Sequence, residues 1–177
     1  MTNQKDILEA LRHTRHDWLN VMQLIKGNLA LKRYDRIETI IETVTQKSIN
    51  ESKLSSMEAP AVAVYLLTYN WNCHALNLDI DIIGEVKSFA SHEPQLLHLC
   101  ESIIKQLTAS SSKDFENTLL LTFLFKDNVC EITFDYHGKL LMKESDWEPV
   151  LKKLDPEVNL VEWDEHECVL CTCFTLN

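Results

Sequence analysis

The chain has 177 residues, a net charge of −10 at pH 7, 45% hydrophobic residues and 25% charged residues. This composition is typical of a soluble globular protein with room for one ordinary domain, or for a helical module and a second compact domain. The negative charge argues against nucleic acid as a partner. No apolar run approaches the roughly 18 residues of a membrane span, and the first residues do not resemble a signal peptide, so we expect no membrane association and a cytoplasmic location.

The cysteine content and the charge distribution indicate the redox state of the thiols and the kind of partner to expect. Six cysteines without a secretory signal indicate reduced thiols rather than a disulfide framework. Basic residues outnumber acidic ones over residues 1–36, and the reverse holds over residues 140–177. The start of the chain therefore suits an acidic partner, unless the asymmetry is a chance fluctuation.

The first predicted element is a long helix from Gln4 to about Leu31. Its apolar residues recur at alternating steps of three and four, as on one stripe of a helix, and only Arg15 interrupts them. The residues of this stripe are Leu8, Leu11, Trp18, Met22, Ile25 and Leu29.

A second helix is expected from about Arg36 to Leu54. Asp35 fits its N-cap, and Glu38 would complete a capping box. The short connection requires an antiparallel helical hairpin. Because two helices cannot cover each other's apolar stripes on both sides, we expect two copies to form a four-helix bundle at a homodimer interface. Packing against the rest of the same chain is the alternative.

After a connector at residues 52–60, the pattern predicts an α+β layer, with one sheet and helices on one of its faces. The expected helices span residues 61–76, 93–109 and 146–154, and the expected strands span residues 78–86, 119–125, 129–136, 158–163 and 168–176. We therefore expect a helical hairpin domain at residues 1–56 and an α+β domain at residues 57–177.

The stretch RHTRHDWLN, residues 12–20, concentrates titratable side chains on the first helix. If the apolar stripe forms the seam of a bundle, His16 falls on the flank that faces solvent. Arg12 lies one turn before it and Asn20 one turn after it. A neutral imidazole in such a place is a competent nucleophile toward a phosphoryl group.

The neighbours of this histidine suit the same chemistry. A guanidinium from Arg12 or Arg15 can neutralise the transferring oxygens, and Asp17 or Asn20 can orient the ring. A surface histidine without a special role is the alternative interpretation of His16.

The run LRHTRHDWLNVMQLIKGNLALKRYD, residues 11–35, resembles the phosphoacceptor-histidine hairpin of two-component histidine kinases. It is most similar to the variant in which an acid follows the histidine and an asparagine stands four residues after it, as in the sporulation phosphotransferases of bacilli. The segments ESKLS, YNW and GEVK, and HEC before the last strand, extend the resemblance over essentially the whole chain.

This resemblance implies a fold and an activity. It implies a homodimer built on a four-helix bundle, with a C-terminal domain that resembles a degenerate histidine-kinase ATPase domain. It also implies a phosphotransferase that controls sporulation initiation. The phosphoryl group would move from the aspartate of one response regulator to His16, and then to the aspartate of a second.

The residues that match the motif are assigned roles by the same resemblance. His16 corresponds to the phosphorylated histidine, Asp17 and Asn20 to its acidic and amide neighbours, and Arg15 to the preceding basic residue. The expected docking surface for the partner includes Arg12, His13 and Gln23, although His13 is also consistent with an inert or merely supportive histidine.

A nucleotide site is not expected. The helix at Leu96–Ser110 lacks the asparagine that would hold Mg²⁺, and FDYHG, residues 134–138, keeps only Gly138 where an Asp-x-Gly turn would follow. We therefore expect no cofactor of the protein's own, and Mg²⁺ supplied by the partner regulator. The alternatives are an ATP-dependent histidine autokinase and a non-catalytic dimeric adaptor that sequesters a response regulator.

No metal site is expected either. The one suggestive group lies in the closing segment HECVLCTC. Cys171 and Cys173 fall on one face of a strand, whereas Cys168 and His166 fall on the other, so the four side chains cannot converge on an ion.

Overall fold

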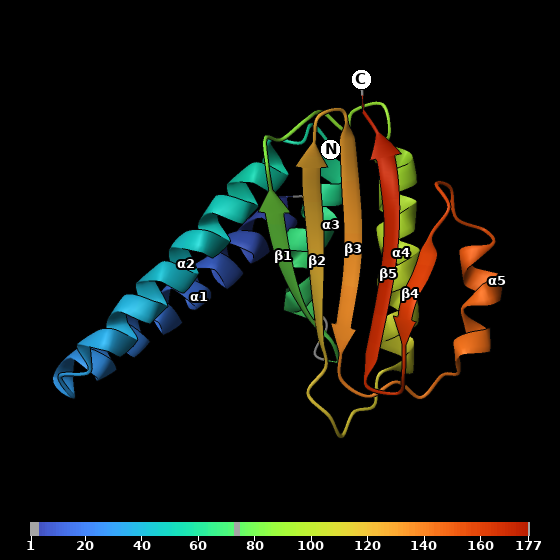
Figure 1. Cartoon of the computed structure of the whole chain (residues 1–177). Helices are drawn as coiled ribbons and strands as arrows, with labels where there is room; N and C mark the ends of the chain where they lie inside the picture. The colour runs from blue at the N-terminus through green and yellow to red at the C-terminus, as the bar shows by residue number, and fades with distance from the viewer. Residues whose placement is uncertain (1–3, 73–74, 177) are drawn as a thin grey trace. The chain divides into compact units, whose positions relative to one another are not determined.

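The computed structural model describes residues 4–72 and 75–176 of the chain. The chain divides into two compact units, residues 1–49 and 50–177. Figure 1 labels the helices and strands of both. Within the described residues, no helix combines the length and the apolar character needed to cross a lipid bilayer.

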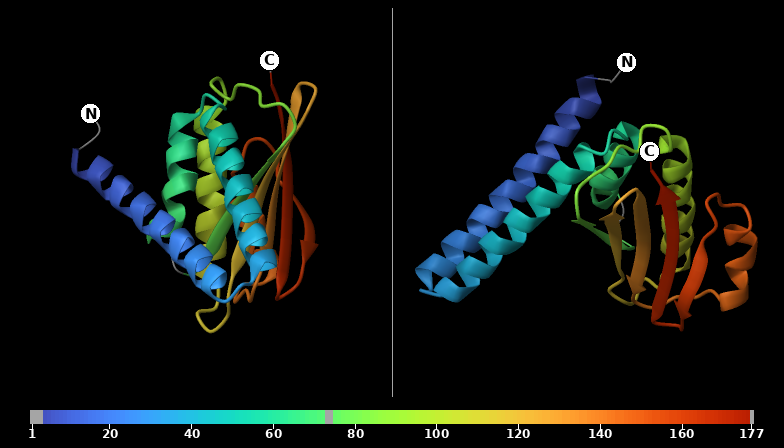
Figure 2. Two further views of the ribbon diagram at one scale, coloured as in Figure 1. Left: turned by 90° about the vertical axis from the view of Figure 1, so that its left-hand side faces the viewer. Right: turned by 45° about the horizontal axis from the view of Figure 1, so that its top comes forward.

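The first unit is an antiparallel helical hairpin, formed by α1 (Gln4–Ala30) and by α2 (Tyr34–Ser55) up to its residue 49 (Figures 1 and 2). The predicted hairpin is confirmed. Lys32 adopts a positive φ of 54°, and the Arg33 amide donates a hydrogen bond of 2.9 Å to the carbonyl of Asn28. This tight turn reverses the chain within three residues.

The start of α2 differs from the predicted one. The helix already begins at Tyr34, because the amide of Ile37 donates to the carbonyl of Arg33. Asp35 therefore lies in the first helical turn, and the predicted capping box with Glu38 is wrong. The carboxylate still favours the helix in this position, since it lies near the positive end of the helix dipole.

The second unit is an α+β layer, as predicted. Its strands are β1 (Asn77–Ile83), β2 (Thr118–Lys126), β3 (Val129–His137), β4 (Asn159–Trp163) and β5 (Glu167–Thr175). They form one sheet in the order β1-β2-β3-β5-β4, in which β1 and β2 are parallel and all other neighbours are antiparallel. The helices are α3 (Pro60–Asn72), α4 (Glu93–Ser110), the 3₁₀ turn η1 (Glu144–Asp146) and α5 (Glu148–Leu151).

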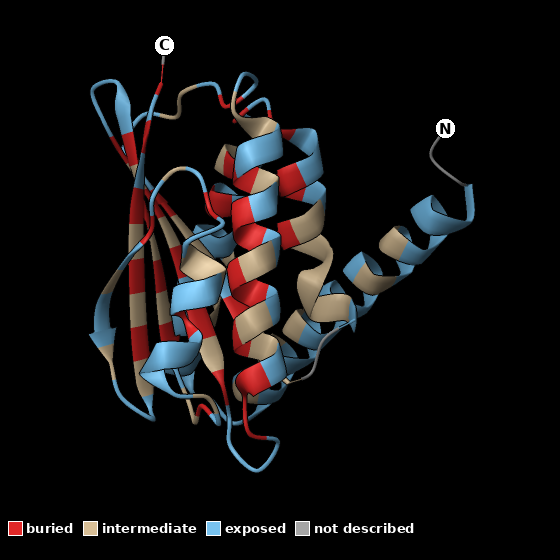
Figure 3. Cartoon of the chain, turned by 90° about the vertical axis from the view of Figure 1, so that its right-hand side faces the viewer, coloured by how far each residue is buried: buried red, intermediate tan, exposed pale blue. Residues whose placement is uncertain are grey.

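One face of the sheet carries the core. Along β2, β3 and β5, every second residue is buried, and the residues between them are exposed or half-buried. The helices of this unit lie on one side of the sheet (Figure 3), so the buried positions face them. The largest fully buried side chains of the unit include Phe89, Leu96, Leu99, Ile103, Phe123, Phe134, Tyr136 and Trp147.

Side chains occupy the free edge of β1. The buried Asn50, near the end of α2, donates to the carbonyl of Ile80 at 3.0 Å and accepts from the amide of Ile82 at 3.3 Å. Asn70 of α3 makes the same pair of bonds with the backbone of Leu78, at 2.7 and 2.9 Å. These amides replace the ladder that a further strand would have provided.

Three predicted elements differ in extent from the structure. The strand expected to reach residue 86 ends at Ile83, because Gly84 adopts a φ of +91° and lies against Phe125, whose carbonyl oxygen is 2.4 Å from the place of a Cβ. The helix expected at residues 146–154 is split into η1 and α5. Pro149 stands at the start of α5 and prevents the helix from extending backwards. The helix expected at residues 61–76 ends at Asn72, and residues 73 and 74 lie outside the described residues.

Asn117 joins three segments of the second unit. This side chain is buried, and its amide group donates to the carbonyls of Ala75, Ser112 and Phe115. Its oxygen accepts from the hydroxyl of Tyr136 and from the amide of Lys139. Every polar atom of the side chain is satisfied, so the loop before β2 and the turn after β3 are held in one place.

Gly138 is required by this arrangement. A Cβ at this position would lie 2.3 Å from Oδ1 of Asn117 and 2.7 Å from the hydroxyl of Tyr136. The glycine therefore has a packing role that does not involve a nucleotide, whereas the sequence suggested the remnant of a nucleotide-binding turn.

The replacement Gly138→Ala should destabilise the second unit by about 1–3 kcal/mol, because the new methyl group must displace buried hydrogen-bonded atoms. Gly27→Ala is the matched control, since nothing lies within 4 Å of its Cβ position and alanine favours a helix. Urea unfolding followed by tryptophan fluorescence measures both changes. An unfolding midpoint of Gly138→Ala equal to that of the unmodified protein would contradict the packing role.

Candidate functional site

His16 lies in the middle of α1 with its ring in solvent. Its side chain is 72% exposed, and α1 contains no buried residue among those described. The ring is therefore accessible to a second macromolecule, as the position on a solvent-facing flank predicted.

One ring nitrogen of His16 has neighbours on the same helix. Nδ1 lies 3.2 Å from the side-chain nitrogen of Asn20, one turn later, and 3.7 Å from a carboxylate oxygen of Asp17. An asparagine amide can present either its oxygen or its nitrogen to the ring, so Asn20 can accept from a protonated Nδ1 or donate to an unprotonated one. Both contacts engage Nδ1, and neither of them occupies Nε2.

The other predicted site residues fall into two groups. Arg12, Arg15 and Gln23 are exposed, and Arg12 and Gln23 lie on the same side of α1 as His16. His13 is half-buried and lies off the exposed side of α1 that carries Arg12, His16 and Gln23. The structure thus brings a cationic and amide-rich surface together around His16, whereas His13 lies at its edge.

A separate face of α1 is apolar and exposed. Trp18 is 47% exposed and Met22 is 53% exposed. The half-buried positions of the helix follow another line, which includes Val21 and Ile25. The full set of large exposed apolar residues on α1 is Ile7, Leu8, Leu11, Trp18, Leu19, Met22, Leu24 and Leu29.

The cysteines of the last strand do not converge. Cys168 is buried on the helix-covered face, Cys171 is half-buried on the opposite face, and Cys173 is exposed there. Burial raises the pKa of the Cys168 thiol to about 12, so this thiol stays protonated at neutral pH. The alternation predicted for this strand is confirmed.

Helix α4 includes the segment Leu96–Ser110, which stands where histidine kinases have their Mg²⁺-holding helix. In this protein α4 is part of the hydrophobic core. Leu96, Ile103 and Leu107 of α4 are buried, and burial also raises the pKa of the Cys100 thiol on this helix to about 12. The residues of α4 that line the shallow groove beside α5 are His98, Ser102 and Gln106, and none of them is a carboxylate or an asparagine.

Sequence reasoning missed one group of side chains. Asp135, His137 and Glu167 lie together on the face of the sheet opposite the core. Part of this group could have been found from the sequence, because Asp135 and His137 lie two positions apart on one predicted strand and therefore share a face. The pairing of His137 with Glu167 depends on the register of β3 against β5, which the sequence did not specify.

Comparison with known families covers both units. Residues 1–57 match the model described as the alpha-helical domain of the Spo0B-type sensor kinases. Residues 58–175 match the model described as the C-terminal part of sporulation initiation phosphotransferase B.

One curated relative gives the same assignment, and solved structures add information on the fold alone. The chain is 30% identical over 174 residues to sporulation initiation phosphotransferase B of Bacillus subtilis (strain 168), and the match covers 96% of this chain and 89% of the relative. Among solved structures, the blue-light activated histidine kinase EL346 of Erythrobacter litoralis matches with a TM-score of 0.50 at 10% identity, over 91% of this chain and 59% of that one. The histidine kinase AdeS of Acinetobacter baumannii matches with a TM-score of 0.46 at 8% identity, over 92% and 98% of the two chains.

The EL346 structure bears on the fold alone, and it agrees with the predicted combination of a helical hairpin and a histidine-kinase-like α+β layer. The family models and the curated relative extend over nearly all of the sequence. The chain therefore belongs to the sporulation initiation phosphotransferase B family and is a phosphotransferase.

Proposed function

We propose that the protein is a phosphorelay histidine phosphotransferase that acts in sporulation initiation. His16 accepts a phosphoryl group from the aspartate of one response regulator and passes it to the aspartate of a second. The observation that carries this proposal is the exposed ring of His16, with Nδ1 engaged by Asn20 and Nε2 outside both contacts.

Each transfer exchanges one bond to phosphorus for another. In the first step, the lone pair of His16 Nε2 attacks the phosphorus of the aspartyl phosphate, the acyl oxygen–phosphorus bond breaks, and the aspartate leaves as a carboxylate. In the second step, the carboxylate of the other regulator attacks phosphorus and the nitrogen–phosphorus bond breaks. Both phosphorylated species are reactive, so the protein mainly supplies in-line alignment and exclusion of water.

The tautomer of His16 decides which nitrogen reacts. Nε2 is nucleophilic only if the ring proton resides on Nδ1. The Asn20 amide, turned so that its oxygen and not its nitrogen meets the ring, would accept from Nδ1–H. The carboxylate of Asp17, 3.7 Å from Nδ1, favours a proton on the same nitrogen and stabilises the ring as it becomes positive during attack. Asn20 and Asp17 are therefore positioning residues.

The basic residues around His16 suit the charge of the transferring group. The guanidinium groups of Arg12 and Arg15 lie within one turn of His16 and can pair with phosphoryl oxygens. The same surface, with His13 and Gln23, receives the acidic phosphorylation pocket of a receiver domain. That pocket would bring the Mg²⁺, so the protein would need no cofactor of its own. The proposal also includes a cytoplasmic location.

The hairpin also forms the dimer in this proposal. A single copy leaves Leu11, Trp18 and Met22 about half exposed on one face of α1. A second copy that covers this stripe would complete a four-helix bundle, while the His16 flank stays open on each protomer. Residues 1–56 act as the dimerisation and phosphoacceptor domain, and residues 57–177 form a kinase-like domain without nucleotide motifs.

The replacement His16→Gln should abolish acceptance of phosphorus from a phosphorylated response regulator. Labelled regulator is mixed with the protein, and intact-mass spectrometry or radiolabel on the protein measures the transfer. His98→Gln removes another exposed histidine, on α4, and serves as the matched control that keeps full transfer.

Two further outcomes separate the alternatives. Self-phosphorylation with labelled ATP alone would identify an autokinase instead. Normal sporulation of cells that carry His16→Gln would identify an adaptor that needs no phosphohistidine.

The replacement Asn20→Ala should slow single-turnover transfer about fivefold to tenfold, because the contact with Nδ1 is worth on the order of 1 kcal/mol. Nitrogen NMR of the His16 ring should show a smaller share of the Nδ1–H tautomer. Asn28→Ala is the control, since the Asn28 side chain instead donates to the carbonyl of Leu24. An unchanged tautomer ratio in Asn20→Ala would remove the positioning role.

The double replacement Leu11→Glu with Met22→Glu should convert the dimer into monomers, because buried carboxylates would face each other across the stripe. Light scattering should give about twice the 20.5 kDa chain mass for the unmodified protein and the chain mass for the variant. Leu141→Glu changes an exposed leucine outside the hairpin and should remain dimeric. A monomeric unmodified protein would refute the bundle.

A further inference from the structure

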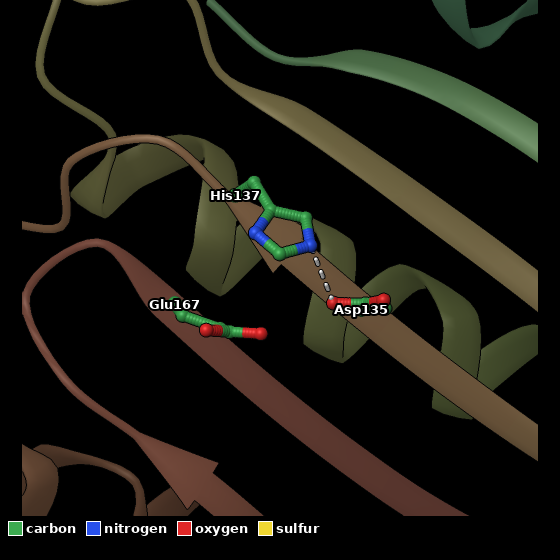
Figure 4. Close-up of side chains that lie close together, drawn as sticks. All are labelled: Asp135, His137 and Glu167. Atoms are coloured by element: carbon green, nitrogen blue, oxygen red, sulfur yellow. Dashed lines mark ion pairs between the residues drawn. The ribbon is translucent and has the colours of Figure 1, made fainter.

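Three potential metal ligands meet at one end of the sheet. Asp135 and His137 lie at the end of β3, and Glu167 opens β5 directly opposite His137 in the antiparallel register. Figure 4 shows the three side chains side by side, with the ring of His137 next to the carboxylate of Asp135. Both strands belong to the second unit and are fixed by continuous pairing, so this juxtaposition is a property of the fold.

The three side chains share the face of the sheet that carries no helix. Their strand neighbours Phe134, Tyr136 and Cys168 are buried toward the helices, so the alternate residues project the other way. The side chain of His137 is 57% exposed and that of Asp135 is 33% exposed. An ion could therefore reach the group from solvent without any rearrangement of the core.

The distances suit a cation. Nε2 of His137 lies 3.1 Å from Oδ1 of Asp135, and one donor atom from each of the three residues lies within 4.8 Å of the other two. Tetrahedral ligands about 2.0–2.2 Å from an ion stand roughly 3.3–3.6 Å apart. Small rotations about the Glu167 side chain would close the remaining difference.

The group also contains an unsatisfied acceptor. Oδ1 of Asp135 is inaccessible to solvent and has no hydrogen-bond partner in the described structure, although it faces the His137 ring. A buried carboxylate oxygen without a partner is costly. Two facing acceptors, Oδ1 and an unprotonated Nε2, need either a proton or a cation between them.

We propose that Asp135, His137 and Glu167 form a binding site for a divalent transition-metal ion of the Zn²⁺ class. Two carboxylates neutralise the charge of the ion, and the imidazole selects Zn²⁺ over Mg²⁺ and Ca²⁺, which prefer all-oxygen sites. Three protein ligands leave a fourth position for water. The ion would join the end of β3 to the start of β5.

The proposed metal site does not include His16. Its ligands lie in the second unit, and His16 lies in the first. The ion would stabilise the second unit, because it binds the folded register of the two strands and not the unfolded chain.

Isothermal titration of the full chain with Zn²⁺ tests the proposal. The titration uses a Cys171→Ser, Cys173→Ser background, because these two thiols on the same face of β5 could bind zinc themselves. Binding of one ion per chain is expected. His137→Gln and Glu167→Gln should each weaken it by at least about tenfold.

The matched controls define the outcome. His98→Gln removes an exposed histidine outside the group and should leave zinc binding unchanged, as should His16→Gln. Mg²⁺ at the same concentrations should not compete. Equal zinc affinity in His137→Gln and the unmodified protein, or no measurable binding at all, would overturn the proposal.

Discussion

The contact between Asn20 and His16 across one helical turn is the interaction on which the proposed chemistry depends. A histidine on an exposed helix can rotate and exchange tautomers freely, and either behaviour would misalign a phosphoryl transfer. Because Asn20 and Asp17 both approach Nδ1, that nitrogen has neighbours on the helix, and Nε2 is the nitrogen to which the proposal assigns the reaction. The helix needs only its own periodicity to build this site, so no loop or cavity is required.

The same helix serves other purposes on its remaining faces. Val21 and Ile25 lie on a half-buried line, whereas Leu11 and Met22 lie on an exposed apolar one. The first line stabilises the hairpin, and the second is available to another copy. The order of the second unit rests on buried polar contacts such as the five hydrogen bonds of the Asn117 side chain.

Much of this organisation could be predicted from the sequence, because hydrophobic periodicity is a local signal. The helix that carries the stripe from Leu8 to Leu29 and the strand alternation around Cys168 were both predicted correctly, whereas the stripe as the seam of a dimer stays a prediction. The predictions that failed or were missed depend on contacts between distant residues or on competing local geometry. The early start of α2 follows from the turn at Lys32, and the packing role of Gly138 follows from Asn117, which is far away in sequence. The roles assigned to His16 and its neighbours came from their spacing on the helix together with the family resemblance, and they stay proposals.

The two edge strands of the sheet, β1 and β4, limit how another chain could pair with it. On one margin, Asn50, Lys53 and Asn70 bind the backbone of β1, and on the other, a bulge next to Val161 interrupts the pairing of β4 with β5. A strand from another chain would have to displace those side chains from β1, or pair with the irregular strand β4. Extension of the sheet by a second chain is therefore disfavoured. The proposed dimer would instead use helices, whose backbone groups are already hydrogen-bonded and cannot extend a sheet.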